Sequence, residues 1–200
     1  MVKSILALTS SGSATSVSTA LTKDIVARLK KKHDGVKVKH HDLVKKPPGF
    51  VDADWTTANL TEADKRTAAQ KKTMAASEKY VDEVLGADII VIGLPIYNFS
   101  IPAVLKAWVD QIIRAKLTFA YKAGGGYDAL VPAGKKVILV VTSGGVPVGS
   151  PYDQATSYLK SVLGFIGLTD VEVIAADQQN TLGSSQTDKA KAEIAQRFAA

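Results

Sequence analysis

Short apolar runs alternate with longer amphipathic segments along the whole chain, and this alternation constrains the fold more than any other feature. Five runs have the length and composition of β-strands: residues 4–10, 36–43, 87–95, 135–143 and 170–176. Helical periodicity marks five further segments: residues 16–32, 62–85, 101–114, 152–165 and 187–198. Strands and helices that take turns in this way form right-handed βαβ units. The sequence therefore predicts an α/β fold with a doubly wound five-stranded parallel sheet and helices on both faces.

The strand runs differ in how completely they are apolar, and this difference indicates their places in the sheet. Residues 4–10, 87–95 and 135–143 are continuously apolar, as expected when helices cover both faces of a strand. Residues 36–43 alternate between apolar and polar, as an edge strand does. Ligands of such sheets bind at the carboxyl ends of the central strands. We therefore expect the functional site in the loops that follow the three continuously apolar runs.

The composition fits one domain that fills residues 1–200. A chain of 200 residues with 46% hydrophobic content can bury a single large core. It has no cysteine, which excludes disulfides, thiolate metal sites and a cysteine nucleophile, and which agrees with a reducing compartment. The apolar run at the N-terminus is too short for a signal peptide, and no segment approaches the roughly 18 apolar residues of a membrane span. We expect a cytoplasmic protein with no membrane partner.

The net charge of +6 raises the question of a nucleic-acid partner. The lysines are scattered over helix ends and turns, without interleaved aromatic residues or a recognition helix. We interpret them as a solvated basic surface and predict no binding to nucleic acid. His33, His40 and His41 are interpreted as surface residues, and no cluster with metal-ligand spacing is present, so no metal site is predicted.

Two connections are longer than a simple crossover needs. Residues 45–61 carry tandem prolines and a tryptophan and are predicted to be irregular, either a lid or partner-contact loop or a surface excursion. Residues 118–136 alternate around a triple glycine, which predicts a small hairpin.

The loop after the first strand is rich in hydroxyl groups. It contains neither G-x-G-x-x-G nor a P-loop motif. A helix that begins near Ser16 would aim its free backbone N–H groups at this loop, where hydroxyls could complete a cage for a phosphate group. Alternatively, Thr15 or Ser16 only caps the helix. The loop holds seven hydroxyl residues: Ser10, Ser11, Ser13, Thr15, Ser16, Ser18 and Thr19.

The loops after the other two central strands suit a flat ligand. Pro95 ends its strand, so the N–H groups of residues 96–99 are expected to lack ladder partners and to face the edge of a heterocycle. The alternative is a tight turn in which Asn98 caps the helix near residue 101. Gly144 and Gly145 would let the backbone approach a planar ring, although a glycine pair is a weak signal alone.

Taken together, the segments "TSSGSATSVS", "LPIYNFSIPAVLKAWVDQIIRAKLTFAY" and "KKVILVVTSGGV" resemble the FMN-dependent NADH azoreductases, flavodoxin-like relatives of the NAD(P)H:quinone oxidoreductases. The resemblance extends from Met1 to about Val171. It implies that the FMN phosphate is held by Ser10, Ser16, Val17 and Ser18. It implies that the isoalloxazine is lined by Pro95, Ile96, Tyr97, Asn98 and Phe99, and that its pyrimidine end meets Ser143, Gly144 and Gly145. It further implies a homodimer with a substrate pocket walled by Phe119 and Tyr121.

The function that this resemblance implies is transfer of two electrons from NADH or NADPH to quinones, azo compounds and other planar aromatics by a ping-pong mechanism. The flavin would carry the chemistry, so no catalytic side chain is predicted. Two alternatives remain: a flavodoxin-like FMN electron carrier without efficient NAD(P)H turnover, and a non-enzymatic or hydrolytic α/β domain. Ile96 stands where many members have methionine, and the arginine that many carry between the serine and the glycines is missing. Both departures bear on substrate and nicotinamide preference.

Overall fold

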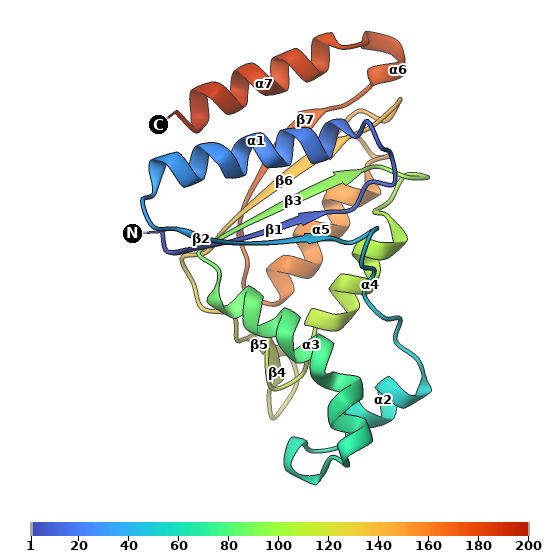
Figure 1. Ribbon diagram of the computed structural model, residues 1–200. Helices are drawn as coiled ribbons and strands as arrows, with labels where there is room; N and C mark the ends of the chain where they lie inside the picture. Colours follow the sequence, from blue (N-terminus) through green and yellow to red (C-terminus); the bar gives the residue numbers. More distant parts are fainter. Residues whose placement is uncertain (1, 200) are drawn as a thin grey trace.

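The protein forms a five-stranded parallel sheet between two layers of helices, as a computed structural model of residues 2–199 shows (Figure 1). The strand order is β2-β1-β3-β6-β7, and every neighbouring pair is parallel. The strands are β1 (Ser4–Thr9), β2 (Lys37–Asp42), β3 (Ile89–Pro95), β6 (Lys136–Thr142) and β7 (Asp170–Ala176). The predicted doubly wound, flavodoxin-like fold class is confirmed.

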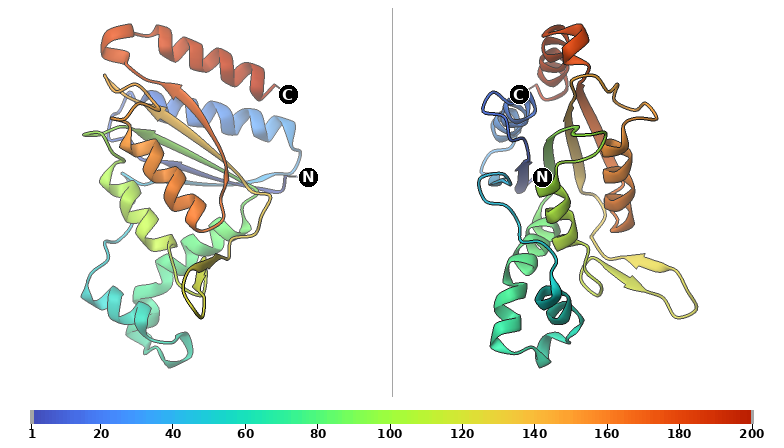
Figure 2. Two further views of the ribbon diagram at one scale, coloured as in Figure 1. Left: turned by 180° about the vertical axis from the view of Figure 1, so that it is seen from behind. Right: turned by 90° about the vertical axis from the view of Figure 1, so that its right-hand side faces the viewer.

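The two faces of the sheet bury two separate apolar cores. One core packs the face that carries Ile5, Val91 and Val140 against α1 (Val17–Lys32) and α7 (Ser185–Arg197). The other core packs the face that carries Leu6 and Ile92 against three helices: α3 (Ala68–Gly86), α4 (Ala103–Ile112) and α5 (Gln154–Phe165). Successive side chains of a strand point to opposite faces, so β1 and β3, which are apolar throughout, serve both cores. Figure 2 shows the sheet edge-on between these layers.

The segment predicted to be irregular contains a helix, α2 (Ala53–Leu60). Asp52 caps it by accepting a hydrogen bond from the backbone N–H of Trp55 at 2.7 Å. Trp55 is buried and donates from Nε1 to Oε1 of Gln111 on α4 at 2.9 Å. The prediction was wrong for residues 53–60 because α2 is short and depends on this tertiary anchor.

The helix predicted over residues 62–85 begins later than expected. Residues 62–67 form a short 3₁₀ turn, η1 (Ala63–Lys65), and a cap. Thr67 and Gln70 form a capping box that starts α3. A four-residue helix, α6 (Gln179–Leu182), also precedes α7.

The predicted hairpin is confirmed as β4 (Phe119–Tyr121) paired antiparallel with β5 (Tyr127–Ala129). All three glycines of its turn have positive φ, which only glycine adopts readily. The ring of Phe119 packs on that of Phe165, at the C-terminal end of α5, with centroids 4.8 Å apart. Because α5 runs back from the carboxyl ends of the strands, the hairpin lies at their amino ends.

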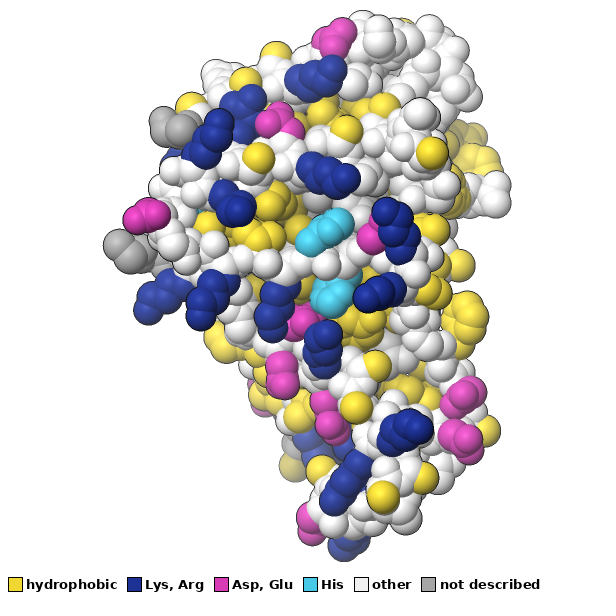
Figure 3. Space-filling view, in the orientation of Figure 1, with side chains coloured by type: hydrophobic (Ala, Val, Ile, Leu, Met, Phe, Trp, Pro, Cys, Tyr) yellow, Lys and Arg dark blue, Asp and Glu magenta, His cyan; other side chains and the backbone are white. Residues whose placement is uncertain are grey.

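Basic side chains spread over the visible face of the molecule with acidic side chains between them (Figure 3). They do not gather into one stripe on this face, which agrees with the interpretation of a solvated surface. Among residues 2–199, no helix has both the length and the hydropathy of a membrane-spanning segment.

Candidate functional site

The three loops singled out in the sequence line one cleft at the carboxyl ends of β1, β3 and β6. Its volume is about 380 Å³. It lies where the strand order reverses between β1 and β3, the position at which open α/β sheets bind ligands. The cleft is lined by Ser11, Ser13, Thr15, Ser16, Val17, Pro95, Ile96, Tyr97, Thr142, Ser143, Gly144, Gln179 and Asn180. No charged side chain is among them.

The hydroxyl loop ends in a capped helix with free donors. Ser16 Oγ accepts a hydrogen bond from the backbone N–H of Thr19 at 3.1 Å, so Ser16 does cap α1. The N–H groups of Val17 and Ser18, in the first turn, have no acceptor among the described residues. Ser16 Oγ also lies 3.2 Å from Ser18 Oγ. The cap and the anion site are therefore compatible, because capping uses one donor and leaves two.

Of the residues assigned to the phosphate by resemblance, Ser16 and Val17 line the cleft, whereas Ser10 and Ser18 are buried behind it. Ser10 Oγ donates to the carbonyl oxygen of Gly93 at 3.0 Å and ties the loop to β3. Ser11, Ser13 and Thr15 line the cleft without having been assigned a role. In the sequence, only the abundance of hydroxyl residues in this loop indicates that these three belong to the site.

The loop after β3 is a tight turn of the I′ type. Tyr97 N–H donates to Ser100 O at 2.9 Å, and Ser100 N–H donates back to Tyr97 O at 3.0 Å. The two residues between them, Asn98 and Phe99, have φ of 47° and 70°. A positive φ is uncommon for asparagine and costly for phenylalanine, and such strain concentrates at functional sites.

The backbone donors of this turn differ from the expectation. Ile96 N–H donates to Thr142 O at 2.7 Å and thus continues the ladder beyond Pro95, so the expectation was wrong for Ile96 and Tyr97. Asn98 and Phe99 do lack an acceptor among the described residues. The alternative in which Asn98 caps the next helix is also wrong, because α4 begins after Pro102 with no side-chain cap.

The third loop is held from behind by the segment that leads into α6. Ser143 Oγ accepts a hydrogen bond from Gln178 N–H at 3.0 Å and donates to Val146 O. A Cβ atom on Gly144 would lie 2.6 Å from Asn180 Nδ2, so a side chain at this position would displace the Asn180 amide. Gly145 has open space at the same position. Asn180 lines the cleft and had no sequence signal, because it lies 36 positions from Gly144.

Phe119 and Tyr121, the predicted substrate-pocket residues, do not reach the cleft of their own chain. They lie on the hairpin at the other end of the sheet, where Tyr121 is 79% exposed. The aromatic residues beside the cleft are Phe99 and Tyr152, whose ring centroids are 6.1 Å apart. Together with residues 145–147 they line an apolar hollow of about 350 Å³. Tyr152 was not predicted to belong to the site.

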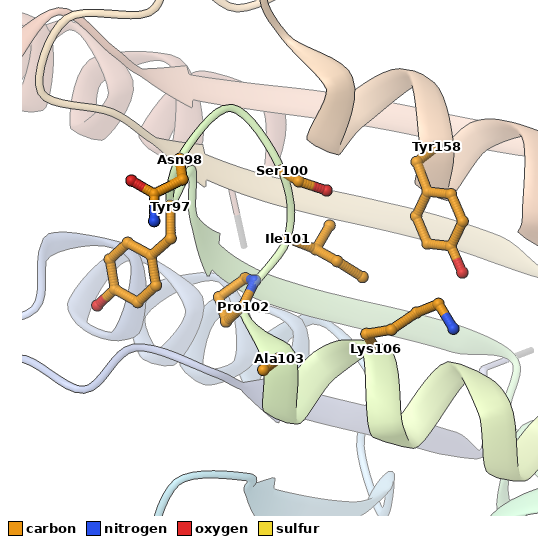
Figure 4. Close-up of a pocket in the computed structure, with 8 residues that line it drawn as sticks. All are labelled: Tyr97, Asn98, Ser100, Ile101, Pro102, Ala103, Lys106 and Tyr158. Atoms are coloured by element: carbon orange, nitrogen blue, oxygen red, sulfur yellow. The ribbon is translucent and has the colours of Figure 1, made fainter. Parts of the chain in front are cut away.

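A second groove borders the turn on its other side, between α4 and α5 (Figure 4). Tyr97 and Asn98 line one end, at the left in Figure 4, and the side chains of Lys106 and Tyr158 approach each other at the other end. Burial raises the pKa of the Tyr158 hydroxyl, and the charge of Lys106 acts in the opposite direction. The turn therefore lies between the cleft and this groove, and Tyr97 lines both of them.

The histidines take no part in the cleft. His41 is only partly exposed, and its Nε2 lies 2.6 Å from Oε2 of the buried Glu83, so the interpretation as a plain surface residue was incomplete. Within residues 2–199, no three histidine or acidic side chains are grouped as metal ligands would be.

Known proteins share the fold and much of the sequence of this chain. A family model described as a flavodoxin-like fold matches residues 3–200. FMN-dependent NADH:quinone oxidoreductase 1 of Jannaschia sp. (strain CCS1) is 50% identical over 163 residues, which cover 82% of this chain and 81% of that protein. The chain belongs to this flavodoxin-like family of FMN-dependent NADH:quinone oxidoreductases. The predicted family is thereby confirmed.

Two further members of the oxidoreductase family illustrate its range. The FMN-dependent NADH:quinone oxidoreductase of Thiobacillus denitrificans (strain ATCC 25259 / T1) is 49% identical over 146 residues, 73% of this chain and 71% of that protein. The crystal structure of an azoreductase from Bacillus anthracis str. Sterne superimposes with a TM-score of 0.88 at 27% identity and covers 98% of each chain.

Proposed function

We propose that the chain is an FMN-dependent oxidoreductase that transfers two electrons from NADH or NADPH to quinones and azo compounds. One observation carries the proposal: three separate loops line one uncharged cleft at the switch point of the sheet, and two of these loops carry free backbone N–H donors, at Val17 and Ser18 and at Asn98 and Phe99. The names of the relatives supply the substrate classes. A cleft with unsatisfied donors but no acid–base pair or metal ligand suits a protein whose cofactor carries the chemistry.

The donor set fits the phosphate end of FMN. Val17 and Ser18 offer backbone N–H groups at the positive end of the α1 dipole, and Ser16 adds a hydroxyl. Ser10 supports this loop from behind through its bond to Gly93. A monoester dianion can be held in this way without a lysine or arginine.

The donor set also fits the ring end. The N–H groups of Asn98 and Phe99 are fixed by the I′ turn, and Gly144 and Gly145 present backbone without side chains. Pro95, Ile96, Tyr97 and Ser143 complete the walls. FMN held there would supply the redox chemistry of a ping-pong cycle, in which two electrons pass from the nicotinamide to the acceptor.

The exposed aromatic residues define the shape of the acceptor. Phe99 and Tyr152 are 54% and 67% exposed and stand beside the ring-binding turn. Two tilted aromatic faces next to an apolar hollow favour planar aromatic acceptors over bulky aliphatic ones.

We propose further that the enzyme is a cytoplasmic homodimer in which the hairpin of one protomer covers the cleft of its partner. The hairpin projects away from the body of the molecule in Figure 2. It carries Tyr121 and Tyr127 as exposed aromatic residues, although each ring also touches another aromatic ring of its own chain. Such a contact would bring Tyr121, with Phe119 packed behind it, to a substrate pocket that each cleft lacks alone.

A spectrum and a turnover assay test the proposal. The purified protein should show the absorption of a bound flavin and should oxidise NADH or NADPH faster when a quinone is added. Protein that takes up no flavin contradicts the whole proposal. Protein that binds FMN but turns over neither nicotinamide favours the electron-carrier alternative, against which the basic composition speaks.

A further inference from the structure

Arg114, just after α4, is a buried cation with few partners. Its exposed fraction is 2%. One of its nitrogens, Nη1, donates to Ser77 Oγ, while Nε has no hydrogen-bond partner. Within residues 2–199, no carboxylate lies close enough to Arg114 to form an ion pair. A guanidinium group has five N–H donors, and buried charges are normally paired, so this side chain is under-satisfied.

The guanidinium group is held in place rather than free to turn toward solvent. It lies over the ring of Trp55, 5.5 Å from the ring centroid. Trp55 is itself fixed by its bond to Gln111, and Gln111 donates from Nε2 to Gly49 O at 2.8 Å. Burial lowers the pKa of Arg114, and the neighbouring charge of Arg66 lowers it further, while the more weakly acting carboxylate of Glu78 raises it. An anion next to Arg114 would relieve both effects.

Arg114 lines a cavity of about 570 Å³ enclosed by α2, η1, α3 and the segment after α4. It shares no lining residue with the cleft. Figure 1 shows α2 beside one end of α3 below the sheet. The walls of the cavity are partly apolar, with Leu60 and Leu117 among them. Lys116 lies at the same wall and forms no ion pair among the described residues.

The other charged groups of this wall are largely paired. Arg66 donates to Ala58 O at 2.8 Å and to Glu78 Oε1 at 2.7 Å. Glu62, also at the wall, pairs with Lys65. Asp64 is the one acidic lining residue without an ion pair in the described part of the chain. The positive charge left to receive a ligand is therefore that of Arg114 and Lys116.

We propose that this cavity is a second ligand site, which binds a small monocarboxylate with a short apolar body through Arg114 and Lys116. The planar fork of a guanidinium matches a carboxylate in two parallel hydrogen bonds. Leu60 and Leu117 can contact the apolar part of such a ligand. The wall also carries three acidic side chains, which repel a dianion such as phosphate more strongly than a monoanion: Glu62, Asp64 and Glu78. The proposal does not depend on the flavin cleft.

Butanoate is the probe for the test, added to the full-length protein with its cofactor bound. The arginine Nε–Hε signals of a ¹⁵N spectrum report the binding directly. We expect one signal, identified as that of Arg114 by its loss in Arg114→Gln, to shift and saturate. Butanamide, the neutral analogue of the same shape, should leave the signal in place, and inorganic phosphate should bind about tenfold more weakly or not at all.

Three variants separate the charges. Arg114→Gln should weaken butanoate binding by about tenfold or more, since hydrogen bonds to charged groups are lost. Lys116→Ala should weaken it about threefold as an exposed charge at the wall. Lys31→Ala removes the same charge from an exposed lysine of α1, away from the cavity, and should leave the affinity unchanged. If Arg114→Gln does not fold, two comparisons still decide the question: Lys116→Ala against Lys31→Ala, and butanoate against butanamide.

Three results would overturn the proposal. The first is no saturable shift up to about 50 mM butanoate, well above the range of a specific weak site. The second is an equal response to butanamide, which would make the cavity a purely apolar one. The third is an Arg114 signal that changes when the protein alone is diluted. Such a change would mean that a carboxylate of a second copy of this chain, and not a small ligand, pairs with Arg114.

Discussion

The phenolic oxygen of Tyr97 lies 3.3 Å from the backbone nitrogen of Gly12 and accepts a hydrogen bond from it. Tyr97 belongs to the turn after β3, and Gly12 belongs to the hydroxyl loop after β1. This bond is a direct link between the ring end and the phosphate end of the cleft. The position of the hydroxyl loop therefore depends on the turn.

Tyr97→Phe should loosen the hydroxyl loop and weaken FMN binding. The bond is exposed and long, so its loss should cost about 0.5–1 kcal/mol, or about a two- to fivefold rise in Kd. Quenching of FMN fluorescence during titration of the apoprotein measures this. Tyr80→Phe, which removes a half-buried α3 hydroxyl with no hydrogen-bond partner in the described chain, should leave Kd unchanged. Equal effects of the two variants would show that the bond has no role.

Ser18→Ala should weaken FMN binding without loss of the helix cap. The Ser18 hydroxyl is buried behind the cleft and lies 3.2 Å from Ser16 Oγ, so loss of this contact should raise the Kd for FMN only about two- to tenfold. Ser16→Ala removes a charge-assisted hydrogen bond to the phosphate of about 1.5–3 kcal/mol, so it should raise the Kd about tenfold or more. It should also lower the stability of the apoprotein by about 1 kcal/mol, because Ser16 caps α1. Riboflavin, which lacks the phosphate, is the control. A matching loss of riboflavin affinity would place the phosphate elsewhere.

Most of the sheet could be predicted because each strand carries its own signal. Continuous burial in β1, β3 and β6 required continuously apolar runs, and such runs are visible without knowledge of neighbours. The helix α2 could not be predicted from periodicity, since it is short and follows two prolines. Its only local signal was Asp52, a good N-cap.

The site could be predicted in position but not in detail. The three loops follow from the topology of the sheet, yet the I′ turn has phenylalanine where asparagine–glycine would be the usual signal. Tertiary contacts impose its positive φ, among them the bond from Gln154 N–H to Phe99 O at 3.0 Å. Asn180 fills the space beside Gly144 only after the whole chain has folded.

Alanine variants are usually more stable than glycine variants of the same residue. Because Phe99 has a positive φ, we expect the opposite order of stability at this position. Phe99→Gly and Phe99→Ala both lose the ring, but only alanine retains the cost of a left-handed conformation, about 1–2 kcal/mol. Phe99→Gly should therefore have the higher melting temperature of the two. Phe50 is exposed and has no positive φ, so Phe50→Ala should be more stable than Phe50→Gly. The same order at both positions would mean that the turn is not strained.

We expect Asp88 to account for part of the stability that the fold loses at low pH. Its carboxylate accepts hydrogen bonds from the backbone N–H groups of Lys3 and Ser4, and these bonds lower its pKa. A lowered pKa in the folded state contributes stability that is complete above the unfolded value of about 3.9 and is lost as the pH falls below it.

Asp88→Asn should therefore reduce stability near neutral pH, with a deficit that shrinks as the pH falls from about 5 to about 2. Urea unfolding at several pH values measures the difference. Asp34→Asn removes an exposed carboxylate with no hydrogen bond in the described chain, and it should retain the pH profile of the wild type. A constant deficit for Asp88→Asn across this range would contradict the prediction.

Gly93 should be the least replaceable glycine of the sheet because α1 crosses β3 directly above it. A Cβ atom at this position would lie 2.2 Å from Thr22 Oγ1 and 3.1 Å from Ser18 O. Thr22 cannot turn aside freely, since it is buried and its hydroxyl donates to Ser18 O at 2.8 Å. In Gly93→Ala the first turn of α1 must therefore shift, and with it the donors proposed for the phosphate.

We expect Gly93→Ala to cost about 1–3 kcal/mol of stability as an overpacked contact and to raise the Kd for FMN as well. Gly86→Ala, where an added Cβ meets nothing within 4 Å, should not reduce stability. Thr22→Ala combined with Gly93→Ala removes the contact at 2.2 Å but leaves Ser18 O, so it should restore both properties in part. If the double variant binds FMN no better than Gly93→Ala, the position of α1 over β3 does not control the phosphate site.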